Sequence, residues 1–213
     1  MNLNSKGYTL IELLAVFVIL GVLMAVTIPN IVGITEANKL QTYAEDAKKF
    51  KNTVEYRFRG DSTIEKPQNN GECIIANLKY VAGSEYDNPP YGGQYMMDQS
   101  YVIMVKDAKQ YKYYVQLVED LDGDEGYRGV GLKDATLLDG EKYQDEIDEA
   151  TNLSSTSSPF GPSLSAIAGA STEAEVTTVL TNLAPQIKGK KITSPDNTLE
   201  QICTTIKTIY YEA

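Results

Sequence analysis

The first sixty residues of the chain divide into an apolar stretch and an amphipathic stretch. No charged residue occurs from Leu13 to Thr35, a run of 23 residues. As a helix, such a run reaches about 30 Å, the thickness of a bilayer core. Beyond it, residues recur at helical steps of three and four and are apolar except for one lysine: Ala37, Leu40, Ala44, Ala47, Lys51, Val54 and Phe58. This pattern predicts one long helix from Tyr8 to about Gly60.

The two halves of this helix have different environments. Residues 8–33 are predicted to span a membrane and residues 34–60 to lay an apolar stripe on a folded domain. Lys6 precedes the apolar run, which favours a cytoplasmic N-terminus and an external remainder, a single-pass topology. Pro29 lacks an amide donor, so we expect the helix to kink or melt locally there.

The residues from 61 to 135 alternate with the period of strands. Four segments are predicted strands: Cys73–Leu78, Tyr101–Lys106, Tyr111–Val118 and Tyr127–Leu132. In the third, Tyr111, Tyr113, Val115 and Leu117 share one face, and Lys112, Tyr114 and Gln116 share the other. Short turns between the last three predict an antiparallel meander packed on the amphipathic half of the helix. The fold class is therefore α+β, with a loop over Gly83–Gln99 that contains Pro-Pro and Gly-Gly pairs.

Residues 136–213 are predicted to form a mainly helical addition. Three segments are the helix candidates: Gly140–Ala150, Ser171–Leu183 and Thr198–Tyr211. The serine-rich stretch Asn152–Ser165 is predicted to be a loop or linker. The third helix candidate is rich in threonine, and β-branched residues also suit strands.

Composition excludes several classes of function. Histidine is absent from the 213 residues, so catalytic mechanisms and metal sites that depend on His are excluded. The net charge of −10 disfavours nucleic-acid binding by the folded part. Much of this charge lies between Glu119 and Glu149, where twelve acidic and three basic residues occur. We interpret this stretch as a solvated surface, with a basic partner or a cation as alternatives. No cofactor is expected.

Two features outside the helix bear on candidate sites. Cys73 and Cys203 could form a disulfide that ties the C-terminal addition to the sheet, or could be two small buried hydrophobic residues. Asp120, Asp122 and Asp124 alternate as the oxygen ligands of calcium loops do. The residues that follow depart from the EF-hand pattern, so a turn rich in Asp and Gly is the simpler interpretation.

Glu12 is unusual because it is a carboxylate inside the apolar region. Such a charge costs about 2.5–3.5 kcal/mol in a membrane helix, and a positive charge at the same depth would compensate it. The apolar run is also longer than that of a secretory signal peptide, and no A-x-A cleavage site follows it.

These residues carry a resemblance to a known family. The segment Lys6-Gly7-Tyr8-Thr9-Leu10-Ile11-Glu12-Leu13-Leu14 resembles the processing site of type IV prepilins and pseudopilins. The resemblance implies the type IV pilin fold and a leader of residues 1–7, removed by prepilin peptidase after Gly7. It also implies methylation of the new amino terminus at Tyr8. This position is usually Phe in the family, and Tyr keeps the aromatic ring.

The resemblance further implies how the chain assembles. Glu12 takes the position that the family keeps acidic, and with Thr9 and Pro29 it belongs to the assembly segment. The amine of Tyr8 can pair with Glu12 of the same subunit or of one already in the fibre, which would set axial register. The implied partners are copies of the chain and other pilin subunits, prepilin peptidase, the membrane and the inner-membrane assembly platform.

Three functions are compatible with these residues. The first is a structural subunit, minor or specialised, of a type IV pilus at the cell surface, serving adhesion, aggregation or twitching motility. The second is a pseudopilin of a type II secretion or DNA-uptake machine. The third is a membrane-anchored enzyme or binding protein, which lacks a catalytic constellation and explains neither Gly7 nor Glu12.

Overall fold

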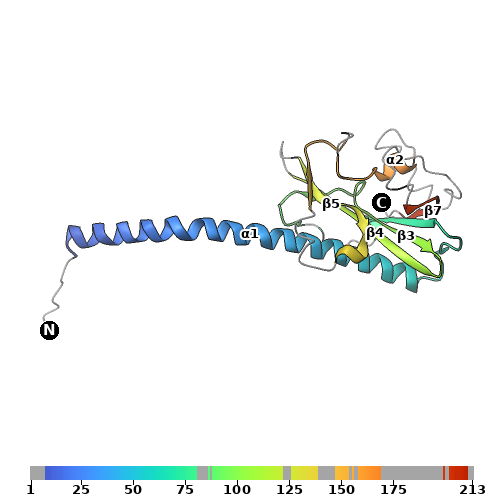
Figure 1. The fold of residues 1–213 in the computed structure, drawn as a ribbon, viewed down its shortest axis with the longest axis horizontal. Coiled ribbons are helices and arrows are strands. Elements are labelled where there is room, and N and C mark those ends of the chain that lie inside the picture. The colour runs from blue at the N-terminus through green and yellow to red at the C-terminus, as the bar shows by residue number, and fades with distance from the viewer. Residues whose placement is uncertain are drawn as a thin grey trace. The chain divides into compact units, whose positions relative to one another are not determined.

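A computed structural model describes most of the chain. It covers residues 8–80, 86, 88–121, 126–138, 147–153, 155, 158–168, 199 and 202–210. The chain forms two compact units, Met1–Lys39 and Leu40–Ala213. The first unit holds the apolar part of the long helix, and the second holds the rest of that helix and the sheet (Figure 1).

The long helix, α1, runs from Leu10 to Gly60 and confirms the predicted helix to within two residues. Its helical assignment continues without a break through Pro29, so the expected local melting is absent from this single chain. A proline removes one backbone hydrogen bond and leaves those of the neighbouring turns available to sustain the helix. The helix ends at Gly60, and Asp61 then accepts hydrogen bonds from the amide and the hydroxyl of Thr63.

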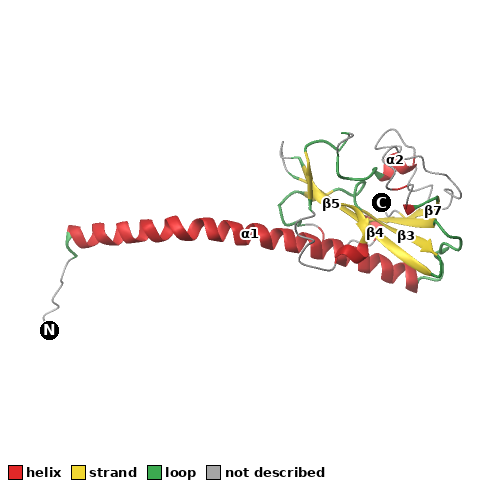
Figure 2. Cartoon of the chain, viewed as in Figure 1, coloured by secondary structure: helices red, strands yellow, loops and turns green. Residues whose placement is uncertain are grey.

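Seven strands of the described part of the chain form one mixed sheet (Figure 2). They are β1 (Glu72–Asn77), β2 (Gln94–Tyr95), β3 (Tyr101–Asp107), β4 (Gln110–Asp120), β5 (Tyr127–Asp134), β6 (Asp148–Ala150) and β7 (Thr205–Tyr210). The order is β6-β5-β4-β3-β1-β7, and β2 pairs with the last residues of β4. All pairs are antiparallel except β1 with β7. Two 3₁₀ turns, Leu78–Tyr80 and Ala135–Leu138, follow β1 and β5.

The predicted meander is confirmed. β3 and β4 pair from Tyr101↔Gln116 to Asp107↔Gln110. The turn between these strands places Ala108 at a φ of 50°, and its amide donates to the side-chain oxygen of Asn70 over 2.8 Å. The two-residue alternation of β4 divides its side chains between two hydrophobic layers, one on each face of the sheet.

One face of the sheet packs on the second half of α1. The helix contributes five wholly buried side chains, at steps of four, three, four and four: Tyr43, Ala47, Phe50, Val54 and Phe58. The sequence pattern identified three of them and missed Tyr43 and Phe50, which take the centre of the stripe in place of the partly buried Ala44 and Lys51. Tyr43 also donates from its hydroxyl to the carbonyl of Arg128 over 3.0 Å.

The opposite face is covered by parts of the C-terminal addition. Leu164 and Ile167, on the short helix α2 (Leu164–Ala168), pack with Ile75 and Ile103 of the sheet. The last two residues of the predicted loop Asn152–Ser165, Leu164 and Ser165, therefore belong to α2. Gln116 fixes this layer, because its side-chain oxygen accepts a hydrogen bond from the amide of Gly161 over 2.7 Å.

The prediction of a mainly helical addition is wrong at two places. Residues 148–150, expected to end a helix over Gly140–Ala150, form β6 beside β5. Residues 205–210, expected within a helix over Thr198–Tyr211, form β7 beside β1. The edges of the sheet offer backbone partners to both segments, and the β-branched residues of β7 suit a strand. The predicted helix Ser171–Leu183 lies outside the described residues.

Candidate assembly site

The first turn of α1 is closed by a reciprocal pair of side chains. The amide and the hydroxyl of Thr9 each donate to Oε2 of Glu12 over 2.8 Å. In return, the Thr9 hydroxyl accepts from the amide of Glu12 over 3.3 Å. This is a capping box, in which two side chains satisfy amides that have no partner within the helix.

The capping box gives Thr9 a role that was not predicted from the sequence, that of capping the first turn of α1. The signal was present, since Thr or Ser followed three residues later by Glu, ahead of an apolar run, marks the start of a helix. The same geometry places the Glu12 carboxylate beside the backbone of Thr9, one residue from Tyr8. Tyr8 itself precedes the helix and is 87% exposed. Gly7, the expected cleavage residue, lies outside the described residues.

The helix that follows exposes an apolar surface. Large hydrophobic side chains from Leu10 to Ile34 are exposed on all sides of this part of α1. α1 is the helix in the described chain that is long and apolar enough to cross a membrane, judged by length and composition. An apolar surface of this kind is covered in a membrane or by neighbouring subunits, because leaving it in water is unfavourable.

The two threonines of this apolar part do not interrupt it chemically. The hydroxyl of Thr27 donates to the carbonyl of Leu23 over 2.9 Å, and that of Thr35 to the carbonyl of Ile31 over 2.9 Å. Both hydroxyls are therefore satisfied within the helix, which is the requirement for a polar group in an apolar environment. Glu12 remains the charged side chain of this part.

Cys73 and Cys203 are joined by a disulfide in the structure, with Cα atoms 5.8 Å apart. Cys73 lies in β1, and Cys203 lies two residues before β7. Both side chains are buried. The amide of Thr204 adds a hydrogen bond to the carbonyl of Gly71 over 2.9 Å. The bond therefore ties the C-terminal strand to the edge of the sheet.

The acidic stretch does not form a described metal site. Asp122 and Asp124 lie outside the described residues, and the described part contains no group of three His, Cys, Asp or Glu side chains placed to hold a metal ion. Asp148 and Glu149 pair with Lys133 and Arg128. Glu119 is buried and accepts a hydrogen bond from the amide of Gly93 over 3.0 Å.

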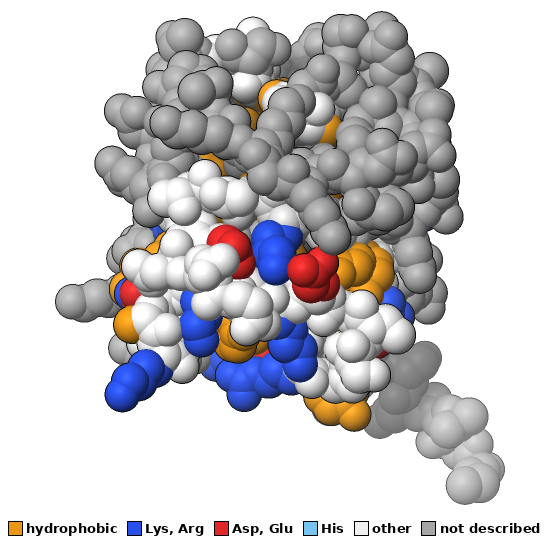
Figure 3. All heavy atoms as spheres, turned by 90° about the vertical axis from the view of Figure 1, so that its right-hand side faces the viewer, with side chains coloured by type: hydrophobic (Ala, Val, Ile, Leu, Met, Phe, Trp, Pro, Cys, Tyr) orange, Lys and Arg blue, Asp and Glu red, His pale blue; other side chains and the backbone are white. Residues whose placement is uncertain are grey.

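The end of the sheet where β3 turns into β4 carries both acidic and basic side chains. Figure 3 shows Lys and Arg side chains among carboxylates on the face at this end. Lys207 pairs there with Glu65 over 3.2 Å and with Glu72 over 3.7 Å, and Lys112 pairs with Asp107 over 2.7 Å. These local pairs make this end a surface of mixed charge, which does not favour a nucleic-acid partner.

Comparison with known proteins finds a family-model match that includes the capped segment. Residues 2–28 match the family model of the prokaryotic N-terminal methylation motif. Comparisons with curated proteins and with solved structures gave no significant match. The motif implies processing by prepilin peptidase and assembly with other pilin subunits, and it points to a structural protein rather than an enzyme. The long helix followed by a mixed sheet is consistent with the pilin fold. At its N-terminus the chain carries the leader signature of type IV prepilins.

Proposed function

We propose that the chain is a structural subunit, minor or specialised, of a type IV pilus at the cell surface. Prepilin peptidase removes residues 1–7 and methylates Tyr8, and the apolar part of α1 carries the subunit from the membrane into the fibre. The observation that carries this proposal is the methylation motif over residues 2–28, placed on an exposed apolar helix with a capped carboxylate at its start.

The geometry around Glu12 supports a role in assembly. Cleavage after Gly7 creates a cationic amine at Tyr8, and methylation keeps the charge. The Glu12 carboxylate already accepts a hydrogen bond from the amide of Thr9. The new amine belongs to Tyr8, the residue directly before Thr9. A charge in an apolar environment is tolerated when it is paired and costly when it is not. Pairing of Tyr8 and Glu12, within or between subunits, lets this segment enter the fibre core.

The structure of the remaining chain suits an external subunit. The disulfide between Cys73 and Cys203 is typical of oxidising compartments outside the cytoplasm. The segments after Asp134 add two edge strands and the covering helix α2 to the sheet. This enlarged C-terminal part supports a specialised subunit, with adhesion, aggregation or twitching motility as the process served.

Mass spectrometry of fibres sheared from the cells tests the proposal. We expect the chain in the long-fibre fraction with an N-methylated start at Tyr8, in smaller amount than another subunit. The same processed start in envelope fractions alone would assign the chain to a secretion or DNA-uptake pseudopilus. An intact start at Met1 would contradict both assignments.

A variant at the cleavage site gives a matched control. Gly7→Val adds a β-branched side chain next to the scissile bond, so we expect unprocessed chain in the membrane and none in fibres. Gly21→Val changes a helical glycine that has open space around it and should be processed normally. Processing of the Gly7 variant at the wild-type rate would contradict the assigned cleavage site.

A further inference from the structure

A pocket lies where β5 begins and β6 ends. The two strands pair there, with Arg128 opposite Glu149. The segment that follows β6 comes back against β5, because a Cβ atom at Gly131 would lie 2.8 Å from the carbonyl oxygen of Pro159. Both strands and this segment line the pocket, which has a volume of about 540 Å³. We name it the β5–β6 pocket.

Polar side chains are in the majority in the lining of this pocket. Its volume falls within the range of about 300–1,000 Å³ that is typical of small-molecule sites. Most such sites are lined mainly by apolar side chains, so the ligand expected here is more polar than usual. Hydroxyl and amide groups both donate and accept hydrogen bonds, as the hydroxyls of a sugar do. Tyr127 adds an aromatic ring that can pack on the apolar face of a sugar ring. The hydroxyl and amide side chains from the segment after β6 are Thr151, Asn152, Ser155 and Ser158.

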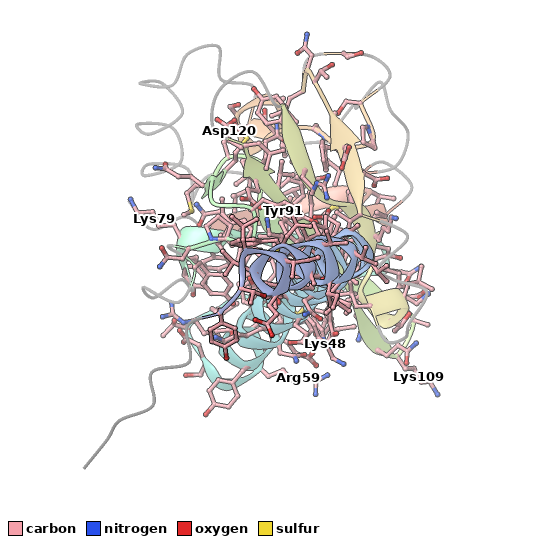
Figure 4. All side chains as sticks on the ribbon, turned by 90° about the vertical axis from the view of Figure 1, so that its left-hand side faces the viewer. Lys48, Arg59, Lys79, Tyr91, Lys109 and Asp120 are labelled. Carbon is pink, nitrogen blue, oxygen red and sulfur yellow. A yellow bond between two sulfur atoms is a disulfide. The ribbon has the colours of Figure 1, made fainter. Side chains whose placement is uncertain are left out.

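The charges in the lining of the pocket balance. Arg128 pairs with Glu149, and the guanidinium also lies over the ring of Tyr91, 4.2 Å from its centroid. Tyr91 contacts Tyr43 with ring centroids 6.5 Å apart, and Figure 4 shows Tyr91 beside α1. The arginine side chain is 16% exposed and the glutamate side chain 61%. The more accessible member of the pair is therefore the carboxylate, which disfavours an anionic ligand.

We propose that the β5–β6 pocket binds a neutral sugar of a glycan. Its size fits a small ligand, its hydroxyl and amide groups fit a ligand rich in hydroxyls, and its balanced charge selects against a ligand that carries a carboxylate or a phosphate. The pocket belongs to the head and is separate from the assembly segment, so this binding goes beyond the proposed function and does not depend on it.

Binding to an array of immobilised glycans tests the proposal. The full chain is solubilised in a polyoxyethylene detergent, which has no sugar headgroup to compete for the pocket. The array holds neutral oligosaccharides, lactose among them, each matched by its sialylated form, which adds a carboxylate. We expect at least one neutral probe to bind about tenfold more strongly than its sialylated form. Binding of no neutral probe, or equal binding of the matched forms, would overturn the proposal.

A substitution at the rim places the binding in this pocket. Asn152 is exposed, so Asn152→Ala should leave the thermal unfolding of the chain unchanged. It should weaken binding of the neutral probe by about fivefold or more, because a hydrogen-bonding side chain is lost. Asn52→Ala, at an exposed position on α1, is the matched control and should bind as the wild type does. Equal binding by the two variants would contradict the assigned site.

Glu149→Gln tests the role of charge in selecting the ligand. The variant keeps the shape of the side chain and leaves the positive charge of Arg128 without its carboxylate. We expect the ratio of sialylated to neutral binding to rise about fivefold or more, because a guanidinium binds carboxylates. A purely structural role of Glu149 would lower both forms equally, and an unchanged ratio would overturn the selection of neutral sugars. All of these assays use purified chain without fibres, so their outcome is distinct from that of the mass spectrometry, which tests the proposed function.

Discussion

Thr9 and Glu12 are bound to each other in both directions, the backbone amide of each residue reaching the side chain of the other. One carboxylate thus has two roles at the start of α1. It caps the helix, and it carries the negative charge that the proposed assembly requires.

Two substitutions of Glu12 separate these roles. Glu12→Gln keeps an oxygen that can accept from Thr9 and removes the charge, whereas Glu12→Val removes both. If charge pairing with the Tyr8 amine drives assembly, both variants should be cleaved normally and both should lose fibre yield to a similar extent. Processed N-terminus and fibre yield are the two measurements. Full assembly of the Gln variant would assign the role of Glu12 to capping, and full assembly of the Val variant would exclude both roles.

The disulfide should contribute strongly to the stability of the head. Its two cysteines are 130 residues apart in the chain. Closing a loop of this length restricts the unfolded chain, and removal of such a bond typically costs about 2–5 kcal/mol. We expect Cys203→Ser to lower the free energy of unfolding by about this amount, measured with denaturant. The double variant with Cys73→Ser should lose no more than the single variant, and wild-type stability in either would show that the bond contributes little.

Gln116 should stabilise the attachment of the C-terminal layer. Its side chain is wholly buried, accepts from the amide of Gly161 and donates to the carbonyl of Gln99 over 2.9 Å. Gln116→Ala leaves buried groups without partners and should cost about 2 kcal/mol or more of unfolding free energy. Gln94→Ala, at an exposed position on β2, should stay within about 0.5 kcal/mol of the wild type. Equal effects of the two variants would contradict this account of Gln116.

The stability of the turn before β1 should decrease at low pH. Hydrogen bonds from the backbone and side chain of Asn69, together with the amide of Gln68 and the charge of Lys207, lower the pKa of Glu72 to about 2. The ordinary pKa of Glu is about 4.3, so the unfolded chain binds more protons than the folded chain between these values. The contribution of Glu72 is therefore fully present above about pH 4.3 and is lost as the pH falls toward 2.

An NMR titration of the Glu72 carboxyl measures this shift. Asn69→Ala removes the side-chain donor and should raise the pKa of Glu72 toward its ordinary value. Gln68→Ala keeps the backbone amide that donates to Glu72 and serves as the control. A midpoint near 4.3 in the wild type would contradict the role of these hydrogen bonds.

Local signals in the sequence were sufficient for α1 and for the central strands. The uncharged run before Glu36, the recurrence of apolar residues up to Phe58 and the two-residue alternation in β4 each act over one or two turns or strands, where the chain's own periodicity decides which side is buried. The capping box of Thr9 and Glu12 is also a local signal, because its two residues are three positions apart in the sequence.

The tertiary structure decided the rest. β6 has a weak local preference and becomes a strand because the edge at β5 offers backbone partners. The β-branched residues of β7 already suit a strand, and the edge at β1 supplies the partner that decides it. Tyr43 and Phe50 are different: with Ala47, Val54 and Phe58 they recur at helical steps of three and four, so the signal for this stripe was present in the sequence and was missed there. The link from Gln116 to Gly161 and the bond from Cys73 to Cys203 join residues 45 and 130 positions apart. Contacts between residues so far apart depend on the path of the whole chain. The leader motif, in contrast, consists of neighbouring residues and can be recognised without the fold.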